Sequence, residues 1–142
     1  MTMSALSVYN LNVYIKECLD CAQTCRVGAE ALADNASKFA KYIAACLECA
    51  KTCEATAKAL LLHKNRTKSI RQSQLEACVM ACRVCGQICT KLGEEFECYT
   101  MCAESVRRCE EILRALIHSV FPKKSSGIVT LLKHLRVRKA AL

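Results

Sequence analysis

The chain has 142 residues, thirteen of them cysteine, and a formal net charge of +8 at pH 7. This length suits one domain with a buried core, and 53% hydrophobic residues exclude a disordered chain. With only four glycines and one proline, an all-β fold rich in turns is disfavoured and helices are expected.

The N-terminal stretch, Met1 to Tyr14, lacks the basic segment, apolar run and cleavage site of a secretory signal. No apolar run approaches the roughly 18 residues that a membrane-spanning helix needs. We therefore expect a cytoplasmic protein, whose thiols stay free or bind metal in the reducing cytosol instead of pairing as disulfides.

Four long helical segments are predicted in chain order, at about 7–33, 37–63, 69–92 and 95–121. The breaks between them fall at Asp34-Asn35, at 65–67, at Gly93 and at Pro122. Long helices joined by short loops predict an all-α fold, an antiparallel up-down-up-down four-helix bundle over residues 1–122. Gly93 is a natural residue just beyond the end of the third helix.

The cysteines lie on one narrow stripe of each helix, because neighbours in a helix are three or four residues apart, with one interval of seven. Apolar residues continue the stripes, among them Leu11, Tyr14, Leu32, Phe39, Tyr42, Leu60, Leu75, Leu92, Ile112 and Leu116. The thiols therefore occupy positions where a bundle normally has leucine and isoleucine. They are Cys18, Cys21, Cys25, Cys46, Cys49, Cys53, Cys78, Cys82, Cys85, Cys89, Cys98, Cys102 and Cys109.

In two adjacent antiparallel helices, the residue number rises along one helix as it falls along the other. Residues at the same height therefore have residue numbers whose sum is nearly constant, and this rule places the thiols in layers. Three layers and a half-filled fourth are predicted, forming a column about 16 Å long. Ser105 stands where the second layer lacks a thiol on the fourth helix. The layers are Cys18, Cys53, Cys78, Cys109; Cys21, Cys49, Cys82 with Ser105; Cys25, Cys46, Cys85, Cys102; and Cys89, Cys98 with Tyr42.

Several uses of such a column compete. Buried cysteine can simply pack as a small hydrophobic residue, but thirteen in register would make a weak core. Disulfides within a helix are disfavoured, because Cβ atoms three or four residues apart are about 5–6 Å from each other. A thioredoxin-like redox role is weak, since the C-x-x-C pairs lie in the middle of helices.

Metal binding fits the spacing better, because two sulfur bonds of about 2.3 Å bridge neighbouring thiols. An all-thiolate site is soft and selects Cu(I), Zn(II) or an iron-sulfur cluster. Zinc prefers closed sets of four ligands, whereas Cu(I) accepts two or three and shares them along a column. The ferredoxin cysteine pattern is absent. Multiple Cu(I) ions are therefore the expected cargo.

The repeats CLDCAQTC at 18–25 and CLECAKTC at 46–53, followed by CVMACRVCGQIC at 78–89, carry a family resemblance. Over roughly residues 7–121 the chain resembles the bacterial copper storage proteins, cysteine-rich four-helix bundles. The resemblance implies a non-catalytic cytosolic store, commonly a homotetramer. It also implies that all thirteen cysteines named above are Cu(I) ligands.

Copper uptake suggests one more residue. His63 returns to the inward stripe at the end of the second helix, where it is either a polar cap facing water or an entrance ligand that passes Cu(I) to the thiols. Met80 and Met101 are both expected to be packing residues, with Met101 a marginal thioether candidate as well, and His118 should face solvent. Cys89 and Cys98, beside Gly93, are the first thiols met if copper enters from the opposite end.

Residues 123–142 carry six lysines and arginines and no acidic residue, and Ile128, Leu131, Leu132 and Leu135 repeat at helical spacing. We interpret this segment as a basic amphipathic tail that packs on the bundle or on a neighbouring subunit. No nucleic-acid motif or membrane anchor accompanies it, so neither partner is expected.

The sequence thus predicts a copper storage protein that binds many Cu(I) ions in its core. A zinc or broad metal buffer is the main alternative, and an iron-sulfur or thiol redox protein is a weaker one. A copper chaperone or a small thiol is a candidate donor of the metal.

Overall fold

The computed structural model describes residues 3–63, 70–94 and 97–121, and the side chains of 11–63, 70–94 and 99–121. The described chain is an all-α bundle of four long helices: α1 (Met3–Ala31), α2 (Ala40–Leu62), α3 (Gln72–Leu92) and α4 (Glu97–Val120), with a 3-10 turn η1 (Ala33–Asn35) between α1 and α2. No strand occurs among these residues. The predicted fold class is confirmed.

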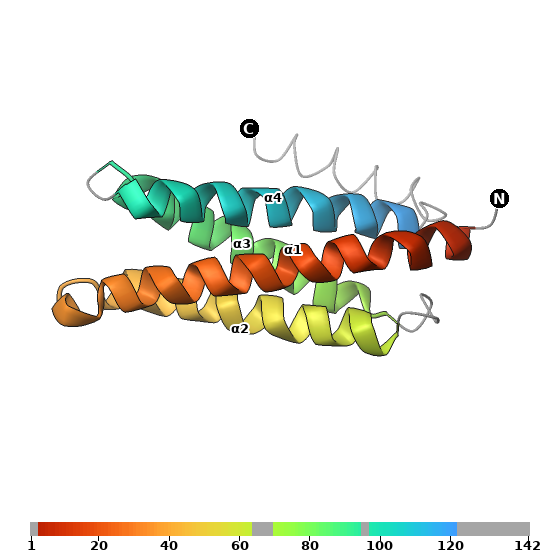
Figure 1. Ribbon diagram of the computed structural model, residues 1–142, viewed down its shortest axis with the longest axis horizontal. Helices are drawn as coiled ribbons and strands as arrows, with labels where there is room; N and C mark the ends of the chain where they lie inside the picture. The colour runs from red at the N-terminus through yellow and green to blue at the C-terminus, as the bar shows by residue number, and fades with distance from the viewer. Residues whose placement is uncertain (1–2, 64–69, 95–96, 122–142) are drawn as a thin grey trace, which may run out of the picture.

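Each helix packs against two neighbours: α1 against α2 and α4, and α3 against α2 and α4. Successive helices run antiparallel, so the η1 turn, the end of α3 and the start of α4 lie at one end of the bundle (Figure 1). None of the described helices has a stretch both long and apolar enough to cross a membrane.

The connection between α1 and α2 differs from the expected two-residue break. The chain after Ala31 forms η1, and the Phe39 amide donates to the Asn35 carbonyl at 3.0 Å before α2 begins at Ala40. Leu32 and Phe39 are both buried on either side of this turn. Their burial holds the connection against the bundle, so the second helix starts later than the expected residue 37.

Gly93 ends α3 as expected, but not through a left-handed conformation. Its φ is −61°, and its amide donates to the Cys89 carbonyl at 2.8 Å. A Cβ atom at this position would lie 2.9 Å from Oγ1 of Thr100 and 3.2 Å from the Cys89 oxygen. Glycine at this position therefore leaves room for the close approach of α4. The break at 65–67, the break at Pro122 and the tail at 123–142 lie outside the described residues.

Candidate metal centre

The cysteine side chains that the structure describes form the axis of the bundle. All twelve are at most 1% exposed, and all are free thiols. They are Cys18, Cys21, Cys25, Cys46, Cys49, Cys53, Cys78, Cys82, Cys85, Cys89, Cys102 and Cys109. Cys98, the thirteenth, lies in the first turn of α4, and its side chain is outside the described part of the structure.

Three pairs of thiols that were predicted to lie at the same height on different helices are in contact. Sγ of Cys53 is 3.6 Å from Sγ of Cys78, and Sγ of Cys49 is 3.9 Å from Sγ of Cys82. The pair Cys25 and Cys85 follows at 3.8 Å between sulfur atoms. These distances join α1, α2 and α3 in the register that the antiparallel topology dictates.

Successive layers also interlock, which the layer prediction did not include. Sγ of Cys53 is 3.8 Å from Sγ of Cys82, one layer away, and Sγ of Cys89 is 3.2 Å from Sγ of Cys102. The spacing between layers is thus as short as the spacing within them. The thiols form a continuous column, in which one sulfur contacts sulfurs above and below it.

Two groups of four thiols have all their sulfur atoms within 4.8 Å of one another. We call them the central quartet and the distal quartet. The central quartet takes one cysteine from each helix and consists of Cys21, Cys53, Cys82 and Cys109. The distal quartet consists of Cys46, Cys85, Cys89 and Cys102.

Two smaller groups, each of three thiols, meet the same limit. One includes Cys18 and Cys78 with Cys109, and the other includes Cys25 and Cys49 with Cys21. Both triads share a member with the central quartet. The column therefore offers overlapping sets of three and four ligands instead of separate sites.

The inward stripe of α4 differs from the expected one. Val106 is fully buried, whereas Ser105, expected to fill the second layer, is only half-buried. Leu113 is likewise buried in place of Ile112. Both Ser105 with Ile112 and Val106 with Leu113 lie at helical spacing from Cys102 and Cys109, so either pair could face the core. The helix is rotated so that the pair with the larger apolar side chains, Val106 and Leu113, is buried.

The fourth layer also differs, because Tyr99 and not Tyr42 is the buried tyrosine at this end. Tyr99 is 1% exposed, and its hydroxyl donates to the carbonyl oxygen of Gly28. A Cβ atom on Gly28 would lie 3.2 Å from the Tyr99 ring, so glycine permits this contact. Tyr99 is three residues before Cys102 and so lies on the same face of the helix. This spacing could have identified it as a buried residue from the sequence.

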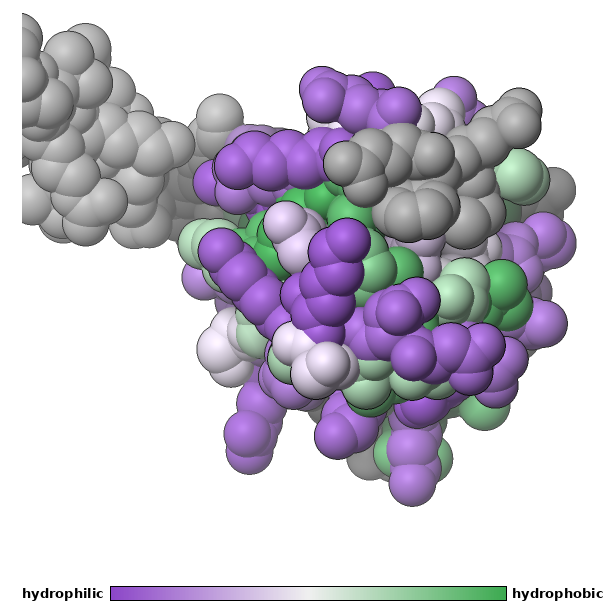
Figure 2. Space-filling model, turned by 90° about the vertical axis from the view of Figure 1, so that its left-hand side faces the viewer, coloured by the Kyte–Doolittle hydropathy of each residue, from purple (hydrophilic) through white to green (hydrophobic). Residues whose placement is uncertain are grey.

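The distal end of the column is closed by side chains. Leu32, Phe39 and Leu92 are buried there together with Tyr99. Figure 2, viewed toward this end, shows hydrophilic side chains around a smaller hydrophobic area.

Leucines close the opposite end, beyond Cys18, Cys53, Cys78 and Cys109. We call these five residues the leucine layer, and each is at most 1% exposed: Leu11, Leu60, Leu75, Leu113 and Leu116. Thr56 is the one fully buried polar residue among the described side chains. Its hydroxyl donates to the Thr52 carbonyl at 2.8 Å and accepts a bond from Gln74 Nε2 at 3.0 Å.

Hydrogen bonds between thiols separate their pKa values within the column. Neighbouring thiols, Cys25 first among them, hold the pKa of Cys102 below the ordinary range. The hydrogen bond with Cys102 and burial hold the pKa of Cys85 above it. Hydrogen bonding with other thiols, Cys18 first, also lowers the pKa of Cys109. Each quartet therefore contains one thiol with a lowered pKa, Cys109 in the central quartet and Cys102 in the distal quartet.

The remaining candidates lie apart from the thiols. His63 is half-buried after the last residue of α2, ten residues beyond Cys53, or about 15 Å along the helix. His118 is exposed as expected. Met80 and Met101 are 55% and 68% exposed, so the expectation that both pack in the core was wrong. None of the ligand groups found among the described residues contains a histidine.

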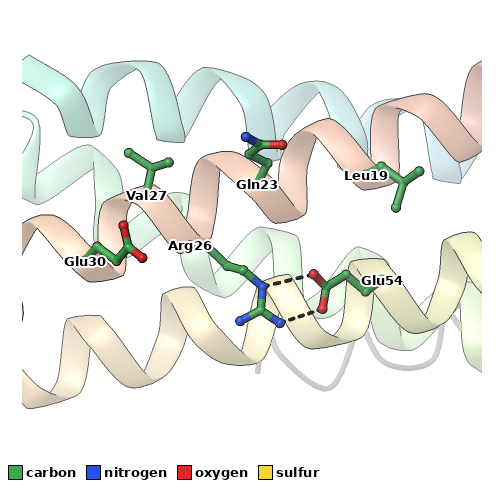
Figure 3. A pocket seen from close by; sticks show the side chains of 6 residues that line it. All are labelled: Leu19, Gln23, Arg26, Val27, Glu30 and Glu54. Carbon is green, nitrogen blue, oxygen red and sulfur yellow. Dashed lines mark hydrogen bonds and ion pairs between the residues drawn. The ribbon is translucent and has the colours of Figure 1, made fainter.

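Surface hollows show where the core comes close to solvent. A hollow of about 530 Å³ lies over the α1–α2 seam, where Arg26 binds Glu54 through both carboxylate oxygens at 2.9 and 2.5 Å (Figure 3). No cysteine lines it. A smaller hollow of about 160 Å³, which we call the side hollow, lies between α3 and α4. It is lined by Cys82, Arg83, Gly86, Gln87 and Thr90 from α3 and by Arg107 and Glu110 from α4.

The donor set is that of a soft metal site. A metal with sulfur bonds of about 2.3 Å spans up to about 4.6 Å between two thiolates, which covers the sulfur contacts of 3.2–4.0 Å in the column. Sulfur atoms 3.2–4.0 Å apart are not disulfide-bonded. The thiols are therefore close enough to share ions.

The comparisons with known proteins agree with this chemistry. The sequence model of the copper storage protein family matches residues 7–118. No match was found among curated proteins.

Two solved structures are similar to the chain. One, described as copper loading to a cytosolic copper storage protein from Streptomyces lividans with five coppers, is 30% identical, with a TM-score of 0.74 over 80% of this chain and 96% of its own. The other is a histidine-to-alanine variant of Ccsp from the same organism. It is 31% identical, with a TM-score of 0.73 over 79% of this chain and 95% of its own.

Proposed function

The chain belongs to the copper storage protein family, and we propose that it stores many Cu(I) ions on the thiolates along its bundle axis. The continuous thiol column carries this proposal. Twelve buried thiols in overlapping sets of three and four provide far more ligands than one regulatory or catalytic metal needs. Cu(I) accepts two or three thiolates and is selected by them.

All thirteen cysteines are proposed as ligands, including Cys98 at the start of α4. Binding displaces the thiol protons, and burial in a bundle core keeps the bound ions from water and oxidants. The protein's own role is to position the thiols and exclude solvent. We propose no catalytic step for it.

An anaerobic Cu(I) titration of the fully reduced protein, against a coloured Cu(I) chelator, tests the proposal. We expect about ten or more ions withheld per chain, because neighbouring ions share thiolates. A plateau at two or three ions would contradict storage and return most of the cysteines to a packing role.

The central quartet favours one alternative, a zinc buffer. Four thiols within 4.8 Å, one from each helix, suit a tetrahedral Zn(II) ion. Competition between Zn(II) and Cu(I) at equal thiol count separates the two functions. Copper storage requires that Cu(I) displace the zinc, whereas a zinc buffer would keep it.

We propose the cytosol as the place of storage, because the similar structures are of a protein described as cytosolic. We also propose a homotetramer as the assembly and a copper chaperone or a small thiol as the donor. Sedimentation of the copper-free and copper-loaded protein tests the assembly, and a mass other than four chains would contradict it.

A further inference from the structure

A further hollow, of about 360 Å³, lies on the same α3–α4 seam as the side hollow. We call it the end hollow, because its residues on α4 belong to the last two turns of that helix. Its lining includes Glu76, Val79, Met80 and Arg83 from α3 and Arg114 and Ile117 from α4.

The end hollow contains an apolar strip that no described residue covers. Met80 is 55% exposed although it is a large apolar side chain, and Val84, one turn later on α3, is 45% exposed. Val79 is nearly buried below them, and Ile117 of α4 is partly buried. Apolar side chains that lie together in this way gain free energy when another segment covers them.

The chain itself leaves the described structure next to this hollow. The last described residue, Phe121, is only four residues beyond Ile117. Residues 122–127 have the proline, serine and glycine content of a turn. The step from Phe121 to Ile128 is seven residues long and can span about 20 Å. The apolar positions of the tail can therefore reach back to the end hollow.

The apolar face of the tail also matches the hollow in length. The apolar tail positions at helical spacing run from Ile128 to Leu135, and the α3 residues of the hollow run from Glu76 to Arg83. Each interval is seven residues, or about 10.5 Å along a helix. A helix with one apolar face is stabilised when that face lies in a groove between two other helices.

The charges of the end hollow are compatible with a basic segment. Arg83 and Arg114 share the Glu110 carboxylate, at 3.5 and 2.8 Å. Glu76 is the one carboxylate of the lining, and it accepts a hydrogen bond from Gln72 at 2.7 Å. It is exposed and forms no ion pair within the described part of the chain. Glu76 is therefore available to a lysine or arginine of the tail, which has no acidic residue.

We propose that residues 123–142 fold back as an amphipathic helix and dock in the end hollow of their own chain. The apolar side chains from Ile128 to Leu135 cover Met80 and Ile117, and a basic side chain of the tail pairs with Glu76. This inference does not depend on copper storage. The match to the family ends at residue 118, so the docked tail is an addition of this chain to the shared bundle.

Hydrogen exchange of the full-length, reduced protein, followed by mass spectrometry, tests the proposal. An isolated helix of this length is hardly populated in water, so slow exchange of the amides in 128–139 reports docking. We expect exchange at least about tenfold slower than in an unfolded peptide. Exchange at the rate of an unfolded peptide would overturn the proposal. Slowing only after vesicles of anionic lipid are added would overturn it in favour of a membrane surface.

Met80→Lys removes an apolar contact and adds a positive charge that repels the tail, so exchange in 128–139 should become about tenfold faster. Met101→Lys is the matched control, because Met101 is likewise an exposed methionine, at 68%, and does not line the end hollow. Urea unfolding of both variants checks that the bundle stays intact. The same exchange rate in the two variants would overturn the end hollow as the docking site.

A charge variant provides the second arm. Glu76→Lys should make exchange in the tail about threefold faster at low salt. Glu48→Lys changes the net charge equally at an exposed position of α2. An equal effect of the two variants would overturn Glu76 as the partner of the tail.

Coexpression of two full-length variants separates docking within one chain from docking on a second copy. One chain carries Met80→Lys and keeps its tail, and the other carries Leu131→Glu and keeps its hollow. Docking within the chain requires fast exchange in both tails, which differ in mass. Slow exchange restored in the tail of the Met80→Lys chain would overturn the proposal in favour of a second copy.

Discussion

At the residue scale, Val106 interrupts the thiol stripe of α4. It is fully buried between Cys102 and Cys109, and it lies against Gly86 of α3. Its branched side chain fills volume that a thiol would not, so the column lacks a ligand at this height. Position 106, not position 105, is therefore where an added thiol would join the column.

We expect Val106→Cys to raise the Cu(I) capacity by about one ion and to lower the stability of the copper-free protein by about 1 kcal/mol through lost packing. Ser105→Cys, one residue away and half-buried, should leave the capacity unchanged. Titration of both variants with Cu(I), beside urea unfolding, measures these effects. A higher Cu(I) capacity in Ser105→Cys alone would show that the face of α4 with Ser105, and not the face with Val106, lies toward the metal.

Tyr99 supplies a hydrogen bond that the end of α1 lacks. The Leu32 amide donates to the carbonyl of Ala29 at 3.2 Å, and the Gly28 carbonyl receives the Tyr99 hydroxyl instead. A helix leaves its last carbonyls without partners inside the helix, and one of them is satisfied here from α4. The contact ties the distal end of α1 to α4.

Tyr99→Phe should therefore cost about 1–3 kcal/mol of unfolding free energy, because a buried carbonyl loses its donor. Chemical denaturation of the copper-free protein measures the loss. Tyr42→Phe is the control, because Tyr42 is only half-buried. Equal losses in the two variants would contradict a specific role for the Tyr99 hydroxyl.

At the element scale, the junction between α3 and α4 depends on the absence of a side chain at Gly93. Replacing glycine by alanine normally stabilises a site with ordinary backbone angles by about 0.4–1 kcal/mol. Here the added methyl group would lie 2.9 Å from Thr100 Oγ1 and 3.2 Å from a backbone oxygen. The steric contact outweighs the gain in backbone entropy.

We expect Gly93→Ala to destabilise the protein by about 1–3 kcal/mol. Lys91→Ala, at an exposed position in the last turn of α3, should change stability by less than about 0.5 kcal/mol. Thermal unfolding of both variants, compared with the unchanged protein, measures the two changes in stability. A more stable Gly93→Ala would mean that α4 shifts to accommodate the methyl group.

The helices and the heights of the thiols could be predicted from the sequence, because spacing and antiparallel register are local properties of the pattern. The sequence alone could not predict which face of α4 is turned toward the core. Two stripes share Cys102 and Cys109, and the choice between Ser105 and Val106 depends on how well each fills the space opposite Gly86. The contact of Tyr99 with Gly28, 71 positions apart, likewise requires the packed helices.

At the scale of the whole molecule, the thiol column makes stability depend on pH. Hydrogen bonds between thiols, followed by burial, raise the pKa of seven cysteines: Cys18, Cys21, Cys25, Cys53, Cys82, Cys85 and Cys89. Above the ordinary thiol pKa of about 8.5, these groups ionise in the unfolded chain but stay protonated in the folded one. The folded state then binds more protons, so its stability falls as the pH rises.

The urea midpoint of the reduced, copper-free protein should therefore decrease between about pH 9 and pH 10.5. Thiols with lowered pKa are ionised in both states over this range and add no slope. In the copper-loaded protein all ligands are thiolates already, so this decrease should be absent. If the urea midpoints of the copper-free and copper-loaded proteins fell equally with pH, the thiol column would not be the cause of the decrease.

The central quartet takes one cysteine from each helix, so an ion held there links the four helices to one another. A ligand that binds only the folded chain lowers the population of unfolded chains, and intracellular proteases degrade mainly such chains. If copper is held there, we expect the copper-loaded protein to have a longer lifetime than the empty one. Empty molecules would be degraded first and filled ones would persist, so the amount of this protein in a cell would follow the copper supply without any change in its synthesis.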